Sequence, residues 1–117
     1  MFGKLFIHSL FFQTLFLPGT ILATETSLDL DISNERQQEL THLLLHDCGS
    51  CHGMTLKGGL GSPLTAEKLK DKPNEALISI ILHGIEGKPM PPWKGILDEQ
   101  EVSWLVDQLK TGELQRN

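Results

Sequence analysis

The sequence predicts a small all-α domain, and three observations support this fold class. Apolar residues recur at three- and four-residue intervals in several segments, which is the spacing of one face of a helix. No segment alternates apolar and polar residues with the period of two that indicates a strand. Proline and glycine separate the helical segments. We expect about four short helices.

The first helix is expected to begin at Asn34, with Gln37 three residues later as its capping partner. It places Leu40, Leu43 and Leu44 on one apolar face. The helix runs into the segment that contains both cysteines of the chain.

Two shorter helices follow in the middle of the chain. One begins at Thr65 and stops before Pro73, since proline restricts the residue before it and cannot continue a helix. The next covers residues 74–83, with Gly84 at its C′ position. Its apolar face consists of Leu77, Ile78, Ile81 and Leu82.

The last helix has the most complete local signals. Asp98 is the expected N-cap and Glu101 closes a capping box, while Leu97 and Val102 form a hydrophobic staple. Gly112 marks the end. The apolar stripe (Val102, Leu105, Val106 and Leu109) can pack across the first helix. Residues 24–33 and 113–117 are expected to be loose ends.

The first 23 residues have the layout of a secretory signal peptide. Lys4 precedes an apolar run over residues 5–17, and a proline-glycine breaker precedes Ala23, after which we expect cleavage. The alternative is an uncleaved membrane anchor, but polar and helix-breaking residues interrupt the run (His8, Gln13, Pro18 and Gly19). We therefore expect a signal peptide over residues 1–23, one domain over residues 24–117, and a periplasmic product without stable membrane association.

Composition restricts the partners and the core. The chain has 10 basic and 15 acidic residues, a net charge of −5, so a nucleic-acid partner is not expected. An acidic protein can instead be steered to a basic patch on another protein. All five Phe residues lie in the signal segment and the chain has no Tyr. The small remaining domain therefore needs additional apolar volume, which a large cofactor would supply.

The two cysteines lie in Cys48-Gly-Ser-Cys51-His52, a pattern typical of c-type haem attachment. Cysteines three residues apart on a helical turn can reach the two vinyl groups of one porphyrin, and the adjoining His52 can bind the iron. We therefore expect one haem c, covalently attached through Cys48 and Cys51, with His52 as the proximal ligand.

Two other readings of the cysteine pair remain open at this point. A thioredoxin-like redox disulfide needs a strand and a helix around the motif, whereas here a helical segment precedes it and a glycine-rich one follows. A zinc site needs further ligands, and the near candidates are His42 and His46. We expect both of these histidines to be solvated.

Met90 is the candidate for the sixth iron ligand. It lies in Gly87-Lys-Pro-Met-Pro-Pro-Trp93, where the prolines leave the loop few unfolded conformations. The alternative is an ordinary core methionine. Met54 is too close to His52 to reach the opposite haem face. His83 is a rival ligand, but its place at a helix end favours a surface or C-cap role.

The stretch Gly58-Gly-Leu-Gly-Ser-Pro63-Leu64 is expected to approach the haem on the side of His52. A metal-bound histidine usually donates its other N–H to an acceptor that fixes the ring. The candidate acceptor is the Pro63 carbonyl, with Leu64 packing on the porphyrin. A plain turn is the alternative.

Together these segments resemble class I monohaem cytochrome c over roughly residues 34–110. More narrowly, Asp47–Gly61 and Leu82–Trp93 resemble the small NirC-type cytochromes encoded beside the haem d1-containing nitrite reductase of denitrifying bacteria. The resemblance implies a cytochrome c fold, axial ligation by His52 and Met90, and Pro63 as the acceptor. Leu40, Leu44 and Gln108 replace the glycine and aromatic residues common at the helix crossing, so we expect a different contact there, with Trp104 as a candidate.

The resulting functional hypothesis is a monomeric single-electron carrier that is not an enzyme. Its redox partner would be cytochrome cd1 nitrite reductase, in the denitrification pathway. The alternative is an accessory haem protein in haem d1 biosynthesis or in maturation of the reductase, in which Met90 leaves the iron. A thiol-disulfide exchanger is the third possibility.

Overall fold

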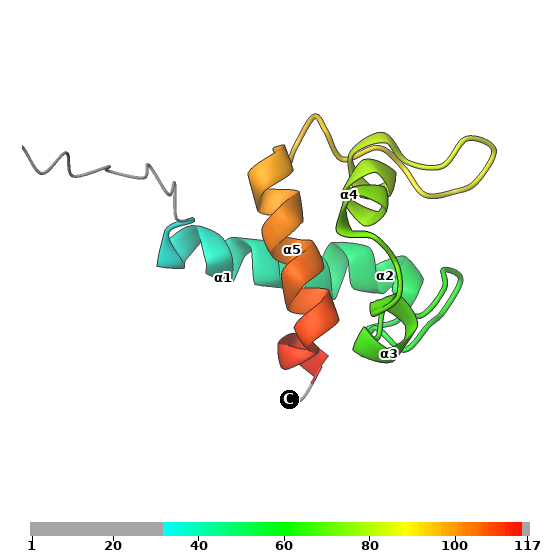
Figure 1. Ribbon diagram of the computed structural model, residues 1–117, viewed down its shortest axis with the longest axis horizontal. Helices are drawn as coiled ribbons and strands as arrows, with labels where there is room; N and C mark the ends of the chain where they lie inside the picture. The colour runs from blue at the N-terminus through cyan, green and yellow to red at the C-terminus, as the bar shows by residue number, and fades with distance from the viewer. Residues whose placement is uncertain (1–31, 116–117) are drawn as a thin grey trace, which may run out of the picture.

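The computed structural model describes residues 32–115, and these residues are helical without a strand, which confirms the all-α prediction. In chain order the elements are α1 (Asn34–Leu43), η1 (Leu44–Cys48), α2 (Gly49–His52), α3 (Ala66–Leu69), α4 (Asn74–His83), α5 (Glu99–Thr111) and η2 (Glu113–Gln115) (Figure 1). The predicted signal peptide, its cleavage site and most of the expected loose segment before the first helix lie outside the described residues.

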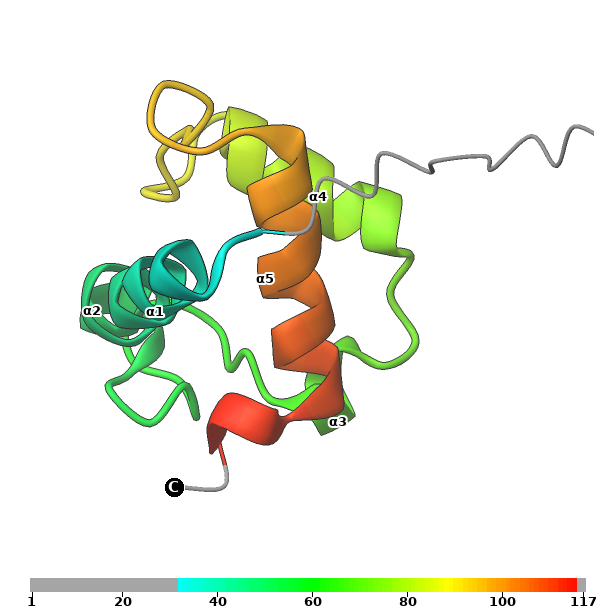
Figure 2. The same ribbon diagram turned by 90° about the vertical axis from the view of Figure 1, so that its left-hand side faces the viewer.

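The first three elements form one continuous helix. The junction residues Leu44, Cys48 and Gly49 all keep right-handed helical dihedral angles. Figure 2 views this helix almost end-on, and α1 and α2 overlap there. The turn η1 is a π-helix, which the sequence did not indicate. The helix therefore carries the cysteine motif at its end, as expected.

The start of the first helix corrects one prediction. Ser33, not Asn34, is the N-cap, and its hydroxyl accepts from the Arg36 backbone N–H at 3.2 Å. The Gln37 side chain instead donates to the backbone carbonyl of Ile32 at 2.8 Å. The helix still begins at Asn34, but its cap lies one residue earlier because the Ser33 carbonyl accepts the first helical bond, from the Gln37 backbone N–H at 2.9 Å.

The core lies where α5 crosses the first helix (Figure 1). Leu40 and Leu44 are buried on the first helix, and Trp104 on α5 is half-buried against the core cluster that contains them. The predicted stripe of α5 is fully buried (Val102, Leu105, Val106 and Leu109). Leucines thus occupy the crossing, as the departures from the family pattern led us to expect.

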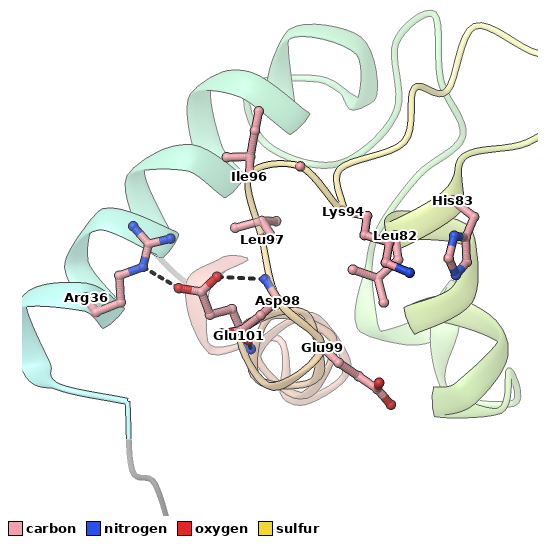
Figure 3. Close-up of a pocket in the computed structure, with 10 residues that line it drawn as sticks. Arg36, Leu82, His83, Lys94, Ile96, Leu97, Asp98, Glu99 and Glu101 are labelled. Atoms are coloured by element: carbon pink, nitrogen blue, oxygen red, sulfur yellow. Dashed lines mark hydrogen bonds and ion pairs between the residues drawn. The ribbon is translucent and has the colours of Figure 1, made fainter.

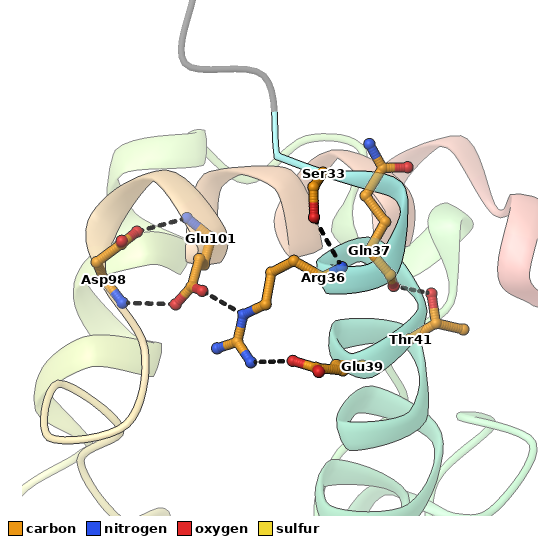
Figure 4. A network of polar contacts seen from close by, with 7 residues as sticks. All are labelled: Ser33, Arg36, Gln37, Glu39, Thr41, Asp98 and Glu101. Carbon is orange, nitrogen blue, oxygen red and sulfur yellow. Dashed lines mark hydrogen bonds and ion pairs between the residues drawn. The ribbon is translucent and has the colours of Figure 1, made fainter.

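A polar brace on one side of the crossing joins the two helices (Figure 4). The Nε of Arg36 donates to Glu101 at 2.5 Å, and its Nη1 donates to Glu39 at 2.7 Å. Asp98 and Glu101 form the predicted capping box of α5. The Arg36 guanidinium holds the pKa of the Glu101 carboxyl below its usual range. The Arg36–Glu101 contact therefore joins α1 to α5, while Glu39 holds the guanidinium from within α1.

The helix predicted over residues 74–83 is confirmed as α4, whereas the one expected from Thr65 to before Pro73 is shorter, since α3 spans Ala66–Leu69. Thr65 is the N-cap of α3, and Gly84 ends α4 with a φ of 70°. Lys110 on α5 donates to the Lys72 carbonyl at 2.8 Å and to Asn74 at 2.7 Å, which fixes the start of α4.

The C-terminal segment differs from the expected loose end. Residues 113–115 form the short helix η2, and Leu114 packs against the core. Among the described residues, no helix is both long and apolar enough to cross a membrane.

Candidate functional site

The cysteine motif lies at the carboxyl end of the first helix. Cys48 is the last residue of η1, and Cys51 and His52 end α2, so all three residues lie within about one turn. Both thiols are free, with Cys48 half-buried against the core and Cys51 exposed. Burial, with a smaller effect of the Asp47 charge, raises the pKa of Cys48 to about 11. Its thiol is therefore held neutral, whereas the Cys51 thiol is open to solvent.

A hydrogen bond fixes the tautomer of His52. Its Nδ1 lies 2.6 Å from the backbone carbonyl oxygen of Ser62. A carbonyl oxygen can only accept, so Nδ1 carries the proton and donates it. The lone pair of the ring is then at Nε2, which is the atom left to bind a metal.

This bond corrects the predicted acceptor, which was the carbonyl of Pro63. The acceptor is one residue earlier, because Leu64 donates its backbone N–H to Leu56 at 2.9 Å while the ring of Pro63 packs beside Gly58. These contacts orient the Ser62 carbonyl, and not that of Pro63, towards His52. Pro63 and Leu64 are both half-buried, and Leu64 packs against the core.

Glycines let this loop lie directly on the motif. Gly58 donates to the His52 carbonyl and Gly61 to the Cys51 carbonyl, both at 2.8 Å. A Cβ at Gly61 would stand 2.8 Å from Nδ1 and Cε1 of His52, and one at Gly59 would stand 2.8 Å from the Cys51 carbonyl. Sequence reasoning identified the loop but missed Gly61 and Ser62 as residues that hold His52; the run of glycines after the motif was the available signal.

Leu56 anchors the loop to the core. Its side chain is 1% exposed and its φ is 57°, the left-handed region that residues with a side chain rarely adopt. Its carbonyl accepts from Leu64, and its N–H donates to Gly53 at 2.7 Å. Burial of the side chain therefore offsets the cost of this backbone conformation.

Met90 lies in the loop between α4 and α5. In Figures 1 and 2 this loop stands above the carboxyl end of the first helix, on the same flank of the molecule as α2. The Met90 side chain is half-buried, and its carbonyl accepts from Ile85 at 3.3 Å. Trp93 and Lys94 donate to carbonyls of α4, each at 3.1 Å. These contacts hold the loop on α4.

The other sulfur and imidazole candidates face solvent. Met54 is 59% exposed. His83 is exposed at the end of α4, as predicted for a surface or C-cap histidine. It lines a cleft of about 510 Å³ between the end of α4, the loop over residues 94–98 and the Arg36–Glu101 brace (Figure 3). None of Cys48, Cys51, His52 and Met90 lines this cleft.

The donor set fits a covalently attached haem. Two free thiols lie on one helical turn, and the next residue has an imidazole whose Nε2 carries the lone pair. Among residues 32–115 no group of three or more His, Cys, Asp and Glu side chains could enclose a metal ion. The arrangement therefore suits iron held by a porphyrin better than a zinc site made by the chain itself.

Residues 35–108 match the family model described as cytochrome c oxidase, cbb3-type, subunit III. Two curated relatives are each called cytochrome c55X. The one from Pseudomonas aeruginosa is 56% identical over 79 residues, which cover 68% of this chain and 66% of the relative. The one from Stutzerimonas stutzeri is 54% identical over 78 residues, which cover 67% of this chain and 69% of the relative. The chain thus spans about two thirds of the length of these relatives.

Two solved structures are also similar. One is described as c-type cytochrome NirC, with a TM-score of 0.69 and 52% identity, covering 70% of this chain and 96% of that chain. The other is the dihydro-haem d1 dehydrogenase NirN in complex with DHE, with a TM-score of 0.55 and 32% identity. That likeness covers 59% of this chain and 15% of that chain.

Proposed function

Because the chain belongs to the c-type cytochrome family, as a NirC-like member, we propose that it is a periplasmic single-electron carrier with one haem. Cys48 and Cys51 would form the two thioether links, and His52 and Met90 would be the axial ligands. A haem bound in this way supplies one-electron chemistry, because its iron changes between the ferrous and ferric states.

The observation that carries this proposal is the hydrogen bond from His52 Nδ1 to the Ser62 carbonyl, at 2.6 Å. It leaves Nε2 as the metal-binding atom and fixes the ring. Met90 on the opposing loop would complete the coordination, so that no position remains for a substrate. A methionine ligand paired with histidine raises the reduction potential.

The proposed partner is a nitrite reductase that contains haem d1. The NirC-type sequence pattern and the structural likeness to NirC at 52% identity support this partner class. The net charge of −5 favours docking to a basic patch, in an association that weakens as salt rises. The signal-like first 23 residues support export to the periplasm.

A second candidate role is supported by the likeness to NirN, whose structure is described as a dihydro-haem d1 dehydrogenase in complex with DHE. In this role the protein would assist haem d1 biosynthesis or maturation of the reductase. Met90 would then leave the iron so that a small molecule or a tetrapyrrole could react there.

Two measurements on the protein exported with its own signal and a maturation system test the carrier proposal. Intact mass should equal the polypeptide cleaved after residue 23 plus one haem. The ferric protein should show the weak far-red band of an iron–thioether bond. A bare polypeptide mass, with thiols free or joined to each other, would overturn the proposal and favour thiol-disulfide exchange.

Gene deletion separates the two haem-protein roles. If the protein is a donor, a deletion strain loses nitrite reduction even when mature reductase is supplied. If it is an assembly factor, added mature reductase restores the activity. Rapid carbon monoxide binding by the unmodified ferrous protein would also argue against the carrier and for an open iron.

A further inference from the structure

Two histidines form a stacked pair on the first helix, apart from the proposed haem ligands. His42 lies in the last turn of α1 and His46 lies in η1, and both side chains are exposed. Their ring centroids are 4.2 Å apart with an angle of 32° between the ring planes. Within the described part of the chain, neither ring makes a hydrogen bond or an ion pair. Both rings therefore keep their nitrogen atoms available to solvent.

The rings meet because residues four apart are neighbours on a helix, and the π-helical turn brings them closer to one line. In a regular α-helix, residues four apart are rotated by about 40° relative to each other. A π turn contains more residues than an α turn, because its hydrogen bonds span five residues. His42 and His46 span the junction of the two geometries, so their side chains come close to a common line along the helix. The backbone geometry of the helix therefore places the two rings close together.

We propose that His42 and His46 form a bidentate site for a divalent transition-metal ion. Imidazole is a good ligand for copper, zinc and nickel, and Cu²⁺ binds most strongly in the usual order of affinities. Metal–nitrogen bonds of about 2.0–2.1 Å place two adjacent ligand atoms about 3 Å apart, a separation that neighbouring rings reach by rotation about their side-chain bonds.

The surroundings favour an exposed site completed by water. Glu39, one turn before His42, is engaged by Arg36 at 2.7 Å. No third His, Cys, Asp or Glu joins the pair into a larger cluster within residues 32–115. The exposed carboxylate of Asp47 follows His46, and the net charge of −5 of the whole chain favours the approach of a cation. A metal ion at this site would therefore have two imidazole ligands, and water would fill its remaining coordination positions.

This site is separate from the haem ligands. His46 precedes His52 by more than one helical turn, and His52 uses its Nδ1 in the bond to Ser62. Occupation of the pair should leave the haem spectrum unchanged. Metal binding at the pair can therefore be measured whatever the identity of the redox partner.

Calorimetric titration of the haem-loaded, signal-cleaved protein with CuCl₂ at neutral pH tests the proposal, with ZnCl₂ as a second titrant. We expect saturable binding of one Cu²⁺ at the pair, and an electron paramagnetic resonance signal of copper with two nitrogen ligands. His42→Ala and His46→Ala should each remove this binding event. His83→Ala, which changes another exposed histidine, should leave it intact.

Two results would overturn the proposal. One is copper binding that persists in the double variant His42→Ala/His46→Ala, which would place the ion elsewhere. The other is the absence of saturable binding in the unmodified protein. Far-ultraviolet circular dichroism and the haem spectrum of each variant check that the fold and the iron ligands are retained; the conservative variants His42→Gln and His46→Gln replace any alanine variant that unfolds.

Discussion

Gly61 lies against the imidazole of His52: a methyl group at position 61 would stand 2.8 Å from both Nδ1 and Cε1 of the ring. The next residue, Ser62, supplies the carbonyl that accepts the Nδ1 proton. The contact and the hydrogen bond both restrain the Nδ1 edge of the ring. The proximal side of the site thus depends on a residue without a side chain.

The first prediction follows from this contact. In Gly61→Ala the new methyl group must displace His52 or the loop, at a cost of about 1–3 kcal/mol for overpacking. We expect less haem per polypeptide and a lower unfolding midpoint, measured by the ratio of haem to protein absorbance and by thermal melting. Gly95→Ala is the control, because a Cβ there meets nothing within 4 Å. Equal haem content in the two variants would contradict the prediction.

The second prediction concerns the proposed sixth ligand. Met90→Ala should lose the far-red band of the ferric protein and should bind carbon monoxide in the ferrous state, because one iron position becomes open. Absorption spectroscopy measures both effects. Met54→Ala is the matched control, since this side chain is 59% exposed and follows His52 closely. Retention of the band in Met90→Ala would show that another group binds the iron.

The third prediction concerns acid stability. The Glu101 carboxyl has a pKa below its usual range, so its stabilising effect is present above that usual range and is lost as the pH falls through the lowered value. Glu101→Gln should reduce the unfolding free energy by about 1 kcal/mol at neutral pH. The difference from the unmodified protein should shrink in acid, measured by urea unfolding at several pH values. Glu99→Gln, an exposed neighbour, should not show this pH dependence.

The fourth prediction concerns the loop anchor. Leu56→Ala keeps the left-handed backbone but removes a side chain that is 1% exposed. We expect a loss of about 2–4 kcal/mol in the unfolding free energy. Leu60→Ala in the same loop should change it by less than about 0.5 kcal/mol, because Leu60 is 96% exposed. Denaturant unfolding of both variants in parallel makes the comparison, and equal losses would contradict the anchoring role.

The parts of the fold that could be predicted have local signals. The ends of α4 and α5 follow from Pro73, Gly84 and Gly112, and from the box of Asp98 and Glu101, all within a few residues of the helix ends. The buried face of α5 could also be predicted, because its apolar residues recur at helical spacing within the same segment.

The parts that were missed depend on contacts between distant segments. The π turn over Leu44–Cys48 has no local signal, because residues four apart share a face in an ordinary α-helix as well. The choice of Ser62 over Pro63 depends on the bond from Leu64 to Leu56. The left-handed conformation of Leu56 is set by burial and not by its residue type. Met90 as an iron ligand stays a prediction.

The unbroken helix from Asn34 to His52 contains both the leucines that seat it on α5 and the groups proposed to hold the cofactor. Cofactor attachment at one end of this helix and core packing along its middle are therefore parts of a single cooperative unit. A ligand fixed at residues 48–52 would stabilise the entire domain by linkage. Unfolding of this helix would, in turn, remove the fixed spacing that lets the two thiols reach one porphyrin.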